Sequence, residues 1–306
     1  MNEEQQNPKP TDAVLGGKAK PQRAAVLGGI EGLKNRLQSP DQQERIIALQ
    51  QAVQYGYEGL KLIKFTNLED KLELGKADNT PLEALQQLVQ DKNERVRNLA
   101  EIHLQEVAEN SNTPVETLQQ LARNENRRIH SGLAINPNTP VEILQKLAQD
   151  QEWTVRKEVA ENSNTLVETL QQLAQDKNWF VRQGVAENPN TPVETLQQLA
   201  QEQEWTIRKE VAINPNTPVE ILQQLAQDEH WEVRQGVGRN KSSPLALVRQ
   251  LVQDKNERVR DLAEIHLQRV AKNPNTPVEI LQQLAQEKNI EVQSCAIKTL
   301  REKGLR

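Results

Sequence analysis

A block close to NTPVEILQQLAQD recurs along most of this chain, and this repeat constrains the fold more than any other feature. The proline of the block, or Leu166 in the same position, recurs every 26 residues, with two intervals of 33. Repeats of about 20 to 50 residues are typical of solenoids, in which each unit packs only on its neighbours. The eight units begin at residues 80, 113, 139, 165, 191, 217, 243 and 276.

Each unit opens with a helix start signal. In the third unit Thr139, Pro140 and Glu142 predict a capping box, with the threonine as N-cap and the proline as the first helical residue. Val141 and Leu144 begin an apolar stripe with helical spacing, so this helix of about three turns must bury one face on its neighbours. A thin stripe favours stacking of successive units.

A second, shorter helix is expected to follow in each unit, for example over residues 153–162. In four of the units it ends where Asn-Pro-Asn-Thr begins, because proline removes an amide donor and disfavours helix in the residue before it. The two 33-residue units carry their seven extra residues in this segment, which is about two helical turns. We therefore predict an all-α solenoid of about eight two-helix repeats.

An acid and an arginine recur six residues apart in six of the units, and this spacing predicts a structural ladder of ion pairs. The second unit has lost both members, and the last unit has lost the arginine. A charge left alone at a partly buried site is costly, so pairing within or between units explains the pattern better than a functional arginine row. The candidates include Asp150, Arg156, Asp176, Arg182, Asp228 and Arg234.

Tryptophan occupies one position in four successive units, and asparagine another position in most of them. A tryptophan row is either a seal over the thin core or a stacking platform, and the seal is the favoured interpretation. The asparagines are expected to bond turn backbone along the stack. The tryptophans are Trp153, Trp179, Trp205 and Trp231.

The composition argues against chemistry in this chain. Cys295 is the only cysteine, which excludes a disulfide framework and a thiolate metal site. His103 and His266 are equivalent residues of the two long units, and both are expected on solvated helix faces. No catalytic, metal or cofactor site is predicted.

The net charge of −5 gives no general attraction to nucleic acid or anionic lipid. There is no apolar run long enough for a membrane span, and no leader peptide, so the expected location is the cytoplasm.

The unit LxxLAxDxxWxVRxxVAxNPxTPxE resembles the leucine-rich repeat variant family. This resemblance implies a right-handed superhelix in which a long α-helix alternates with a shorter, often 3₁₀-like, helix. It also implies a binding scaffold. The acid and arginine spacing is similar to that of HEAT-like repeats.

The first 79 residues differ from the array. Residues 1–22 contain three prolines and few aliphatic residues, so they are expected to be a disordered tail. Residues 23–79 resemble a HEAT-like leader and are expected to form a helical cap. The array itself is expected over residues 80–306.

Two clusters of cations depart from the consensus unit and are candidate contacts for a partner. The junction between the sixth and seventh units adds Arg239, Lys241 and Arg249 and lacks the glutamate that opens other units. The second unit adds Arg123, Arg127 and Arg128.

The sequence therefore predicts a non-enzymatic scaffold that binds another, unidentified protein. One alternative resembles HEAT-like bilin lyases and chaperones, which hold a tetrapyrrole. The other resembles nucleic-acid-binding HEAT-like proteins, and the acidic balance of the chain disfavours it.

Overall fold

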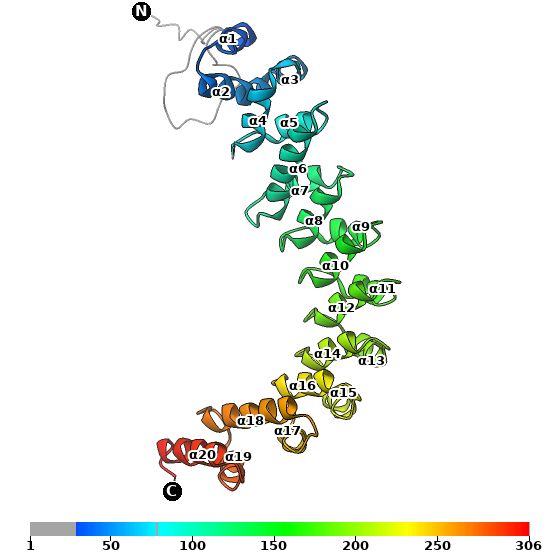
Figure 1. The fold of residues 1–306 in the computed structure, drawn as a ribbon, viewed down its shortest axis with the longest axis vertical. Helices are drawn as coiled ribbons and strands as arrows, with labels where there is room; N and C mark the ends of the chain where they lie inside the picture. Colours follow the sequence, from blue (N-terminus) through cyan, green and yellow to red (C-terminus); the bar gives the residue numbers. More distant parts are fainter. Residues whose placement is uncertain (1–28, 78, 306) are drawn as a thin grey trace, which may run out of the picture. The chain divides into compact units, whose positions relative to one another are not determined.

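The computed structural model describes residues 29–77 and 79–305, and the predicted disordered tail at 1–22 lies outside them. The described residues form α-helices, one 3₁₀-helix and no strand (Figure 1). The prediction of an all-α fold built from two-helix repeats is therefore confirmed. The chain divides into two compact blocks, an N-terminal block ending at Leu133 and a C-terminal block beginning at Ala134.

In the N-terminal block, five helices and a 3₁₀-helix precede the first long helix. The bounds are α1 Gly29–Arg36, α2 Gln42–Ala52, η1 Val53–Tyr55, α3 Gly56–Phe65, α4 Leu68–Lys76, α5 Leu82–Leu88, α6 Glu94–Glu109 and α7 Val115–Leu121. The helices α2, α4 and α6 contact one another in succession, and α3 contacts α5. The two-layer stacking therefore begins before residue 80, within the segment predicted as a cap.

Helix α8 (Arg127–Ile135) spans the boundary between the blocks, and the C-terminal block holds the rest. The bounds are α9 Val141–Leu147, α10 Trp153–Glu161, α11 Val167–Leu173, α12 Trp179–Glu187, α13 Val193–Leu199, α14 Trp205–Ile213, α15 Val219–Leu225, α16 Trp231–Arg239, α17 Leu245–Leu251, α18 Glu257–Lys272, α19 Val278–Leu284 and α20 Ile290–Glu302. The odd-numbered helices of this block, which we term first helices, follow one side of the stack, and the even-numbered second helices follow the other (Figure 1).

The relative lengths of the two helices differ from the prediction. Every first helix of the C-terminal block has seven residues, whereas the complete 26-residue units have second helices of nine. First helices end early because the chain tightens after them: Gln175 and Asp176 donate amide N–H groups to carbonyls only three residues back. The seven-residue insertion lengthens α6 and α18 to 16 residues each, as the spacing predicted.

The predicted capping box does not form. The N-cap of the first helices is the residue after the threonine or serine, which is Leu166 in α11 and proline in the others, and Pro192 has the extended angles φ −68° and ψ 155°. The threonine before it caps the preceding helix instead, since the Thr191 hydroxyl donates to the Val185 carbonyl at 2.5 Å. The same carbonyl accepts the Asn188 amide N–H at 3.2 Å, so the hydroxyl is a second donor to the last turn of α12.

The start of the first helix also changes which residues are buried. Val141 was predicted to lie in the apolar stripe, but it is only half-buried, and so is Leu245, the equivalent residue of α17. The residue two positions later is buried instead, as with Leu247, which is 7% exposed. Because the valine is the first helical residue, its side chain lies at the edge of the stack rather than between units.

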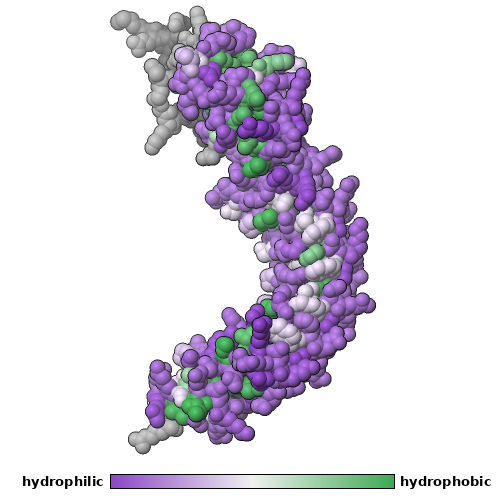
Figure 2. Space-filling view, viewed as in Figure 1, coloured by the Kyte–Doolittle hydropathy of each residue, from purple (hydrophilic) through white to green (hydrophobic). Residues whose placement is uncertain are grey.

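The core is a narrow row of aliphatic side chains between the two helix layers, including Val155, Val159 and Leu170, which are fully buried. The surface is predominantly hydrophilic, with separated apolar patches (Figure 2). Among the described helices, none is both long and apolar enough to span a bilayer.

Candidate interaction surfaces

The arginines of the ladder bind acids in the following unit. The Nε and Nη2 atoms of Arg156 donate to the two carboxylate oxygens of Asp176 at 2.6 and 3.0 Å. The same bidentate geometry joins Arg182 to Glu202, Arg208 to Asp228, and Arg234 to Asp254. These side chains are 5% to 19% exposed, so the ladder lies inside the stack.

The acid that lies six residues before each arginine, in the same unit, binds it through the backbone carbonyl and not through the carboxylate. Arg156 Nη1 donates to the carbonyl of Asp150, while the Asp150 carboxylate accepts the Glu152 amide N–H. One guanidinium therefore fixes the turn of its own unit and the acid of the next. Arg45 in α2 makes the same set of bonds, to Asp70 and to the Ser39 carbonyl, so the ladder begins in the segment predicted as a cap.

The pKa values of the ladder aspartates Asp176, Asp228 and Asp254 are lowered. The bidentate bond from Arg234 lowers the pKa of Asp254, against the opposing effect of burial. At Asp176 burial raises the pKa, but the bond from Arg156 and the Asn178 amide outweigh it, so the pKa is lowered. These charges are engaged within the stack, which leaves them no capacity to recruit a partner.

The repeated asparagines form a second ladder. The Nδ2 atom of Asn188 donates to the carbonyls of Ala160 and Asn162 in the preceding unit, at 2.6 and 2.9 Å. Its Oδ1 atom accepts the Asn190 amide N–H at 2.8 Å. Asn162, Asn214 and Asn240 repeat the pattern.

The prediction that His103 and His266 face solvent is wrong, because they are 8% and 4% exposed. His266 lies 26 residues after Asn240 and contacts the Gly238 carbonyl through Nδ1 at 3.0 Å, in the position that asparagine holds in shorter units. The lengthened helix passes through this position and presents a longer side chain to it. Burial lowers the pKa of His266, assisted by the charge of Arg269 and opposed by the bond to Gly238.

The tryptophans begin the second helices, and two of them, Trp153 and Trp205, stack on residues of the next unit. The Trp153 ring stacks on Phe180 at 5.0 Å between centroids, and Trp205 stacks on His230 at 3.9 Å. Trp179 stacks on the adjacent Phe180 at 3.6 Å, and the Arg258 guanidinium lies 5.2 Å from the Trp231 ring. The four tryptophans are half-buried, so the row is partly covered by side chains of this chain.

The cations predicted at the junction of the sixth and seventh units do not act as one group. Arg239, at the end of α16, and Lys241, in the turn after it, are exposed. Arg249 lies on α17 and donates through Nε to Glu287 of the last unit at 2.5 Å. Glu287 is the residue of the last unit that is equivalent to the acids of the arginine ladder, so Arg249 takes the place of a ladder arginine there. The sequence did not reveal this contact, because it does not show the direction of a half-buried side chain.

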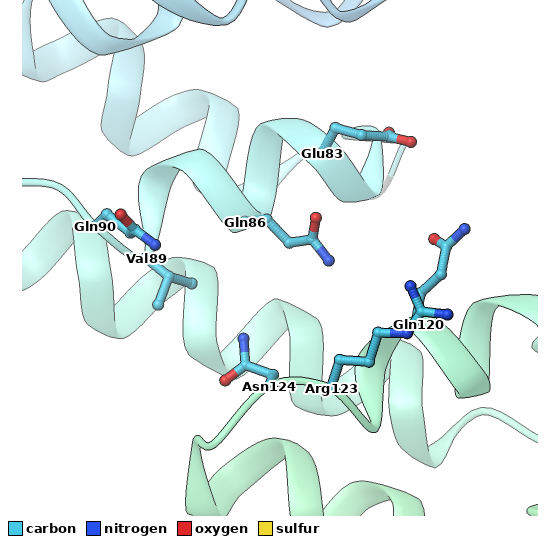
Figure 3. Close-up of a pocket in the computed structure, with 7 residues that line it drawn as sticks. All are labelled: Glu83, Gln86, Val89, Gln90, Gln120, Arg123 and Asn124. Carbon is cyan, nitrogen blue, oxygen red and sulfur yellow. The ribbon is translucent and has the colours of Figure 1, made fainter.

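The second cluster divides between two hollows of the N-terminal block. Arg123 lines a polar hollow of about 510 Å³ with Glu83 and Gln86 of α5 and Gln120 of α7 (Figure 3). Arg127 and Arg128 line another, with Glu101 and Gln105 of α6 and Ser131. All three arginines are exposed.

Some charges of the second helices in the C-terminal block are paired with a neighbour on the same helix. Lys157 binds Glu161, and Lys209 binds Glu210. Glu187 accepts a bond from Gln183 at 2.7 Å. Burial raises the pKa of Glu187, and the nearby charges of Glu210 and Glu161 raise it further.

The first helices present a different surface, which the sequence analysis did not identify as a candidate. Each of α11, α13 and α15 begins with an exposed valine followed by an exposed glutamate. We term this surface the first-helix face, and it consists of Val167, Glu168, Val193, Glu194, Val219 and Glu220. The valines are 37% to 43% exposed. The repeated Val-Glu pair in the sequence could have identified this surface. The sequence analysis interpreted the valine as part of the buried stripe and the glutamate as part of the capping box.

Glycine in alternate units adds a two-unit period to the stack. Gly184 and Gly236 are 52 residues apart, and the intervening unit has Glu210 in the same position. A Cβ atom on Gly236 would lie 3.0 Å from the Ala212 Cβ and 3.2 Å from the Lys209 carbonyl oxygen. The helices α14 and α16 therefore approach closely at this glycine.

No group of metal-ligating side chains occurs in residues 29–77 and 79–305.

Residues 179–204 match the family model described as leucine rich repeat variant. This segment is one full period, containing α12 and α13. The array resembles leucine-rich repeat variant proteins. The resemblance inferred from the sequence is thus confirmed.

A solved leucine-rich repeat variant, described as having a novel repetitive structural motif, is 22% identical, with a TM-score of 0.50. The match covers 75% of this chain and 88% of that one, and it supports the variant-like fold. An engineered protein is 17% identical over 89% of this chain and 98% of its own, with a TM-score of 0.38. Importin beta is 14% identical over 90% of this chain and 40% of its own, with a TM-score of 0.34. No curated protein matched the sequence.

Proposed function

We propose that this protein is a non-enzymatic scaffold that binds another protein through the repeated surface of its solenoid. The observation that carries the proposal is the first-helix face, where exposed valines recur at 26-residue intervals. The arginine and asparagine ladders account for stacking without these valines. Aliphatic side chains aligned at the surface, and flanked by polar residues, are typical of protein interaction sites.

The charge distribution favours a protein partner over nucleic acid. Each exposed valine of α11, α13 and α15 is next to an exposed glutamate, and a phosphate backbone would be repelled there. The exposed Arg239 and Lys241 supply a candidate second contact, for an acidic part of the same partner.

The proposal is tested by capture from native lysate with the full chain as bait. We expect the triple variant Val167→Ser, Val193→Ser, Val219→Ser to lose a partner that the parent protein retains. A matched control is Ile265→Ser with Ile290→Ser, because these residues are 55% and 75% exposed but lie on second helices. Equal recovery by the parent and the triple variant would contradict the proposal.

A further inference from the structure

Resting on the proposed scaffold function, we propose that a hollow beside Trp179 binds an arginine side chain of the partner protein. The hollow has a volume of about 500 Å³ and lies between the fourth and fifth units. Its lining includes Lys177 and Trp179 of the fourth unit, and Gln198, Gln201 and Glu204 of the fifth. We term it the Trp179 hollow.

The tryptophan row consists of two aromatic stacks. In the first, Phe180 stacks on both Trp153 and Trp179, with ring centroids 5.0 and 3.6 Å apart. In the second, His230 stacks on the two remaining tryptophans in the same way. The guanidinium of Arg258 extends the second stack, because it lies 5.2 Å from the ring of its last tryptophan. The first stack ends at the hollow.

The residues that cover the tryptophans come from equivalent positions of the next unit. They lie 25 or 27 residues further along the chain, and they are Phe180 for Trp153, His230 for Trp205 and Arg258 for Trp231. For Trp179 the two positions hold Glu204 and Thr206, which have neither a ring nor a cation. Of the four tryptophans, all within the described residues, Trp179 is the one that the next unit leaves without such a cover.

Arg258 indicates which kind of group fits over an uncovered tryptophan of this row. A guanidinium is planar, remains charged, and stacks on an aromatic face. Phe180 and His230 cover their tryptophans with planar rings, so flatness is common to the three covering groups. We therefore expect a flat group over Trp179, and the polar lining of the hollow selects a guanidinium among flat groups.

The polar lining supplies acceptors for the N–H groups of an arginine. Glu204 is the N-cap of α14, and its exposed side chain makes no capping bond. Within residues 29–77 and 79–305 its carboxylate forms no ion pair. The amide oxygens of Gln198 and Gln201 are further acceptors. A phenyl ring offers no donor to any of these groups.

The other charges of the hollow set the sign of its selectivity. Arg182 and Glu202 also line it, but they bind each other through two hydrogen bonds of 2.7 and 3.1 Å. Lys177 is exposed and repels a cation, whereas Glu204 attracts one. Removing the charge of Lys177 should therefore tighten the binding of an arginine, and removing that of Glu204 should weaken it. An anionic ligand would respond with the opposite signs.

The hollow adjoins the first-helix face. Gln198 lies four residues after Glu194 on α13, and side chains four residues apart are neighbours on a helix surface. Both side chains are exposed. Val193 is five residues before Gln198, which is about 8 Å along the helix axis. One partner can therefore contact the valine and place an arginine in the hollow.

The test is a titration of the ¹⁵N-labelled full chain with Nα-acetyl-arginine amide, followed by the NMR signals of the tryptophan indole N–H groups. The variant Trp179→Phe assigns the signal of Trp179. We expect that signal to shift with a saturable, millimolar dissociation constant, and the other indole signals to shift little. Nα-acetyl-citrulline amide, which has a similar shape without the charge, should bind about fivefold more weakly.

Three results of this titration would overturn the inference. They are equal binding of the arginine and citrulline probes, equal shifts of all the indole signals, and tighter binding of Nα-acetyl-phenylalanine amide, which would assign the hollow to an aromatic side chain.

Matched variants separate the hollow from general electrostatics. Glu204→Gln should weaken the arginine probe about threefold, and Lys177→Gln should tighten it about twofold. The control Glu152→Gln removes the equivalent exposed N-cap acid two units earlier, and should change the affinity by less than about 1.5-fold. Equal weakening by Glu204→Gln and Glu152→Gln, or weakening by Lys177→Gln, would refute the inference.

A further variant fills the hollow from within the chain. Thr206→Arg places an arginine 27 residues after Trp179, as Arg258 follows Trp231. It should shift the Trp179 indole signal and weaken the arginine probe more than about tenfold, because the ring then has its own guanidinium. Undiminished binding of the probe by this variant, with its helical circular dichroism intact, would contradict the assignment of the site.

The same variant separates this inference from the proposed function. In capture from lysate, a partner that is retained through the valines of the first-helix face should be recovered less well by Thr206→Arg. Equal recovery of that partner by the parent and Thr206→Arg would refute the arginine site alone. Equal recovery by the parent and the valine variant would refute the scaffold surface, whatever the probe shows.

Discussion

The arginine ladder makes a quantitative prediction about which acid each arginine stabilises. We consider a double-mutant cycle between Arg156 and Asp176, whose side chains are 8% and 10% exposed and joined by two hydrogen bonds. Removing one member of a buried pair is expected to cost about 3 kcal/mol, because the other charge is left without its partner. The double alanine variant should cost less than the sum of the single changes, with a coupling of about 2 kcal/mol.

A second cycle, between Arg156 and Asp150, is the matched control. Arg156 reaches the backbone carbonyl of Asp150, and this carbonyl remains when the side chain is shortened to alanine. We therefore expect a coupling within about 0.5 kcal/mol.

Both cycles can be measured by urea denaturation followed by helical circular dichroism, with the denaturant slope compared between variants. A coupling between Arg156 and Asp150 as large as that between Arg156 and Asp176 would refute the inter-unit ladder.

Three further predictions test the stack. Deleting residues 191–216, one complete period, should leave a shorter protein with a cooperative helical melt, and loss of that melt would contradict solenoid stability. Gly236→Ala should destabilise the protein by about 1–3 kcal/mol, because the added Cβ atom would lie 3.0 Å from the Ala212 Cβ. Gly238→Ala should stabilise it by up to about 1 kcal/mol, because no atom lies nearer than 3.8 Å to the added Cβ. Equal effects on the melting temperature would contradict the close approach of α14 and α16. His266 has a lowered pKa in the folded chain, so its contribution to stability should be full above pH about 6.5 and should fall at lower pH, where the unfolded state binds the proton first. His266→Asn should remove this loss of stability at low pH. An identical pH profile of denaturation for the parent and the variant would contradict this prediction.

The sequence by itself determined the repeat, its two helices and the location of the long units. The apolar residues recur with helical spacing, and the proline before every first helix except α11 fixes the start of that helix to within one residue. The seven-residue insertions add two turns, which keeps the buried side of α6 and α18 in register.

The exact start of the helix was decided by a contact with the preceding helix. A threonine before proline has the sequence signature of an N-cap, yet the hydroxyl of Thr191 reaches the Val185 carbonyl. The burial of His266 depends likewise on the Gly238 carbonyl, which is 28 residues away. Local propensity contains no information on either partner.

Only the tertiary structure decided which acid pairs with which arginine. In a strict repeat, Asp150 and Asp176 are equivalent residues, so the sequence interval cannot separate pairing within a unit from pairing with the next. The stacking places Asp176 against the Nε and Nη2 atoms of Arg156, while Asp150 presents its backbone carbonyl to Nη1. The period specifies the residues of the ladder, and the packing of adjacent units specifies its bonds, because those bonds exist only where two units meet.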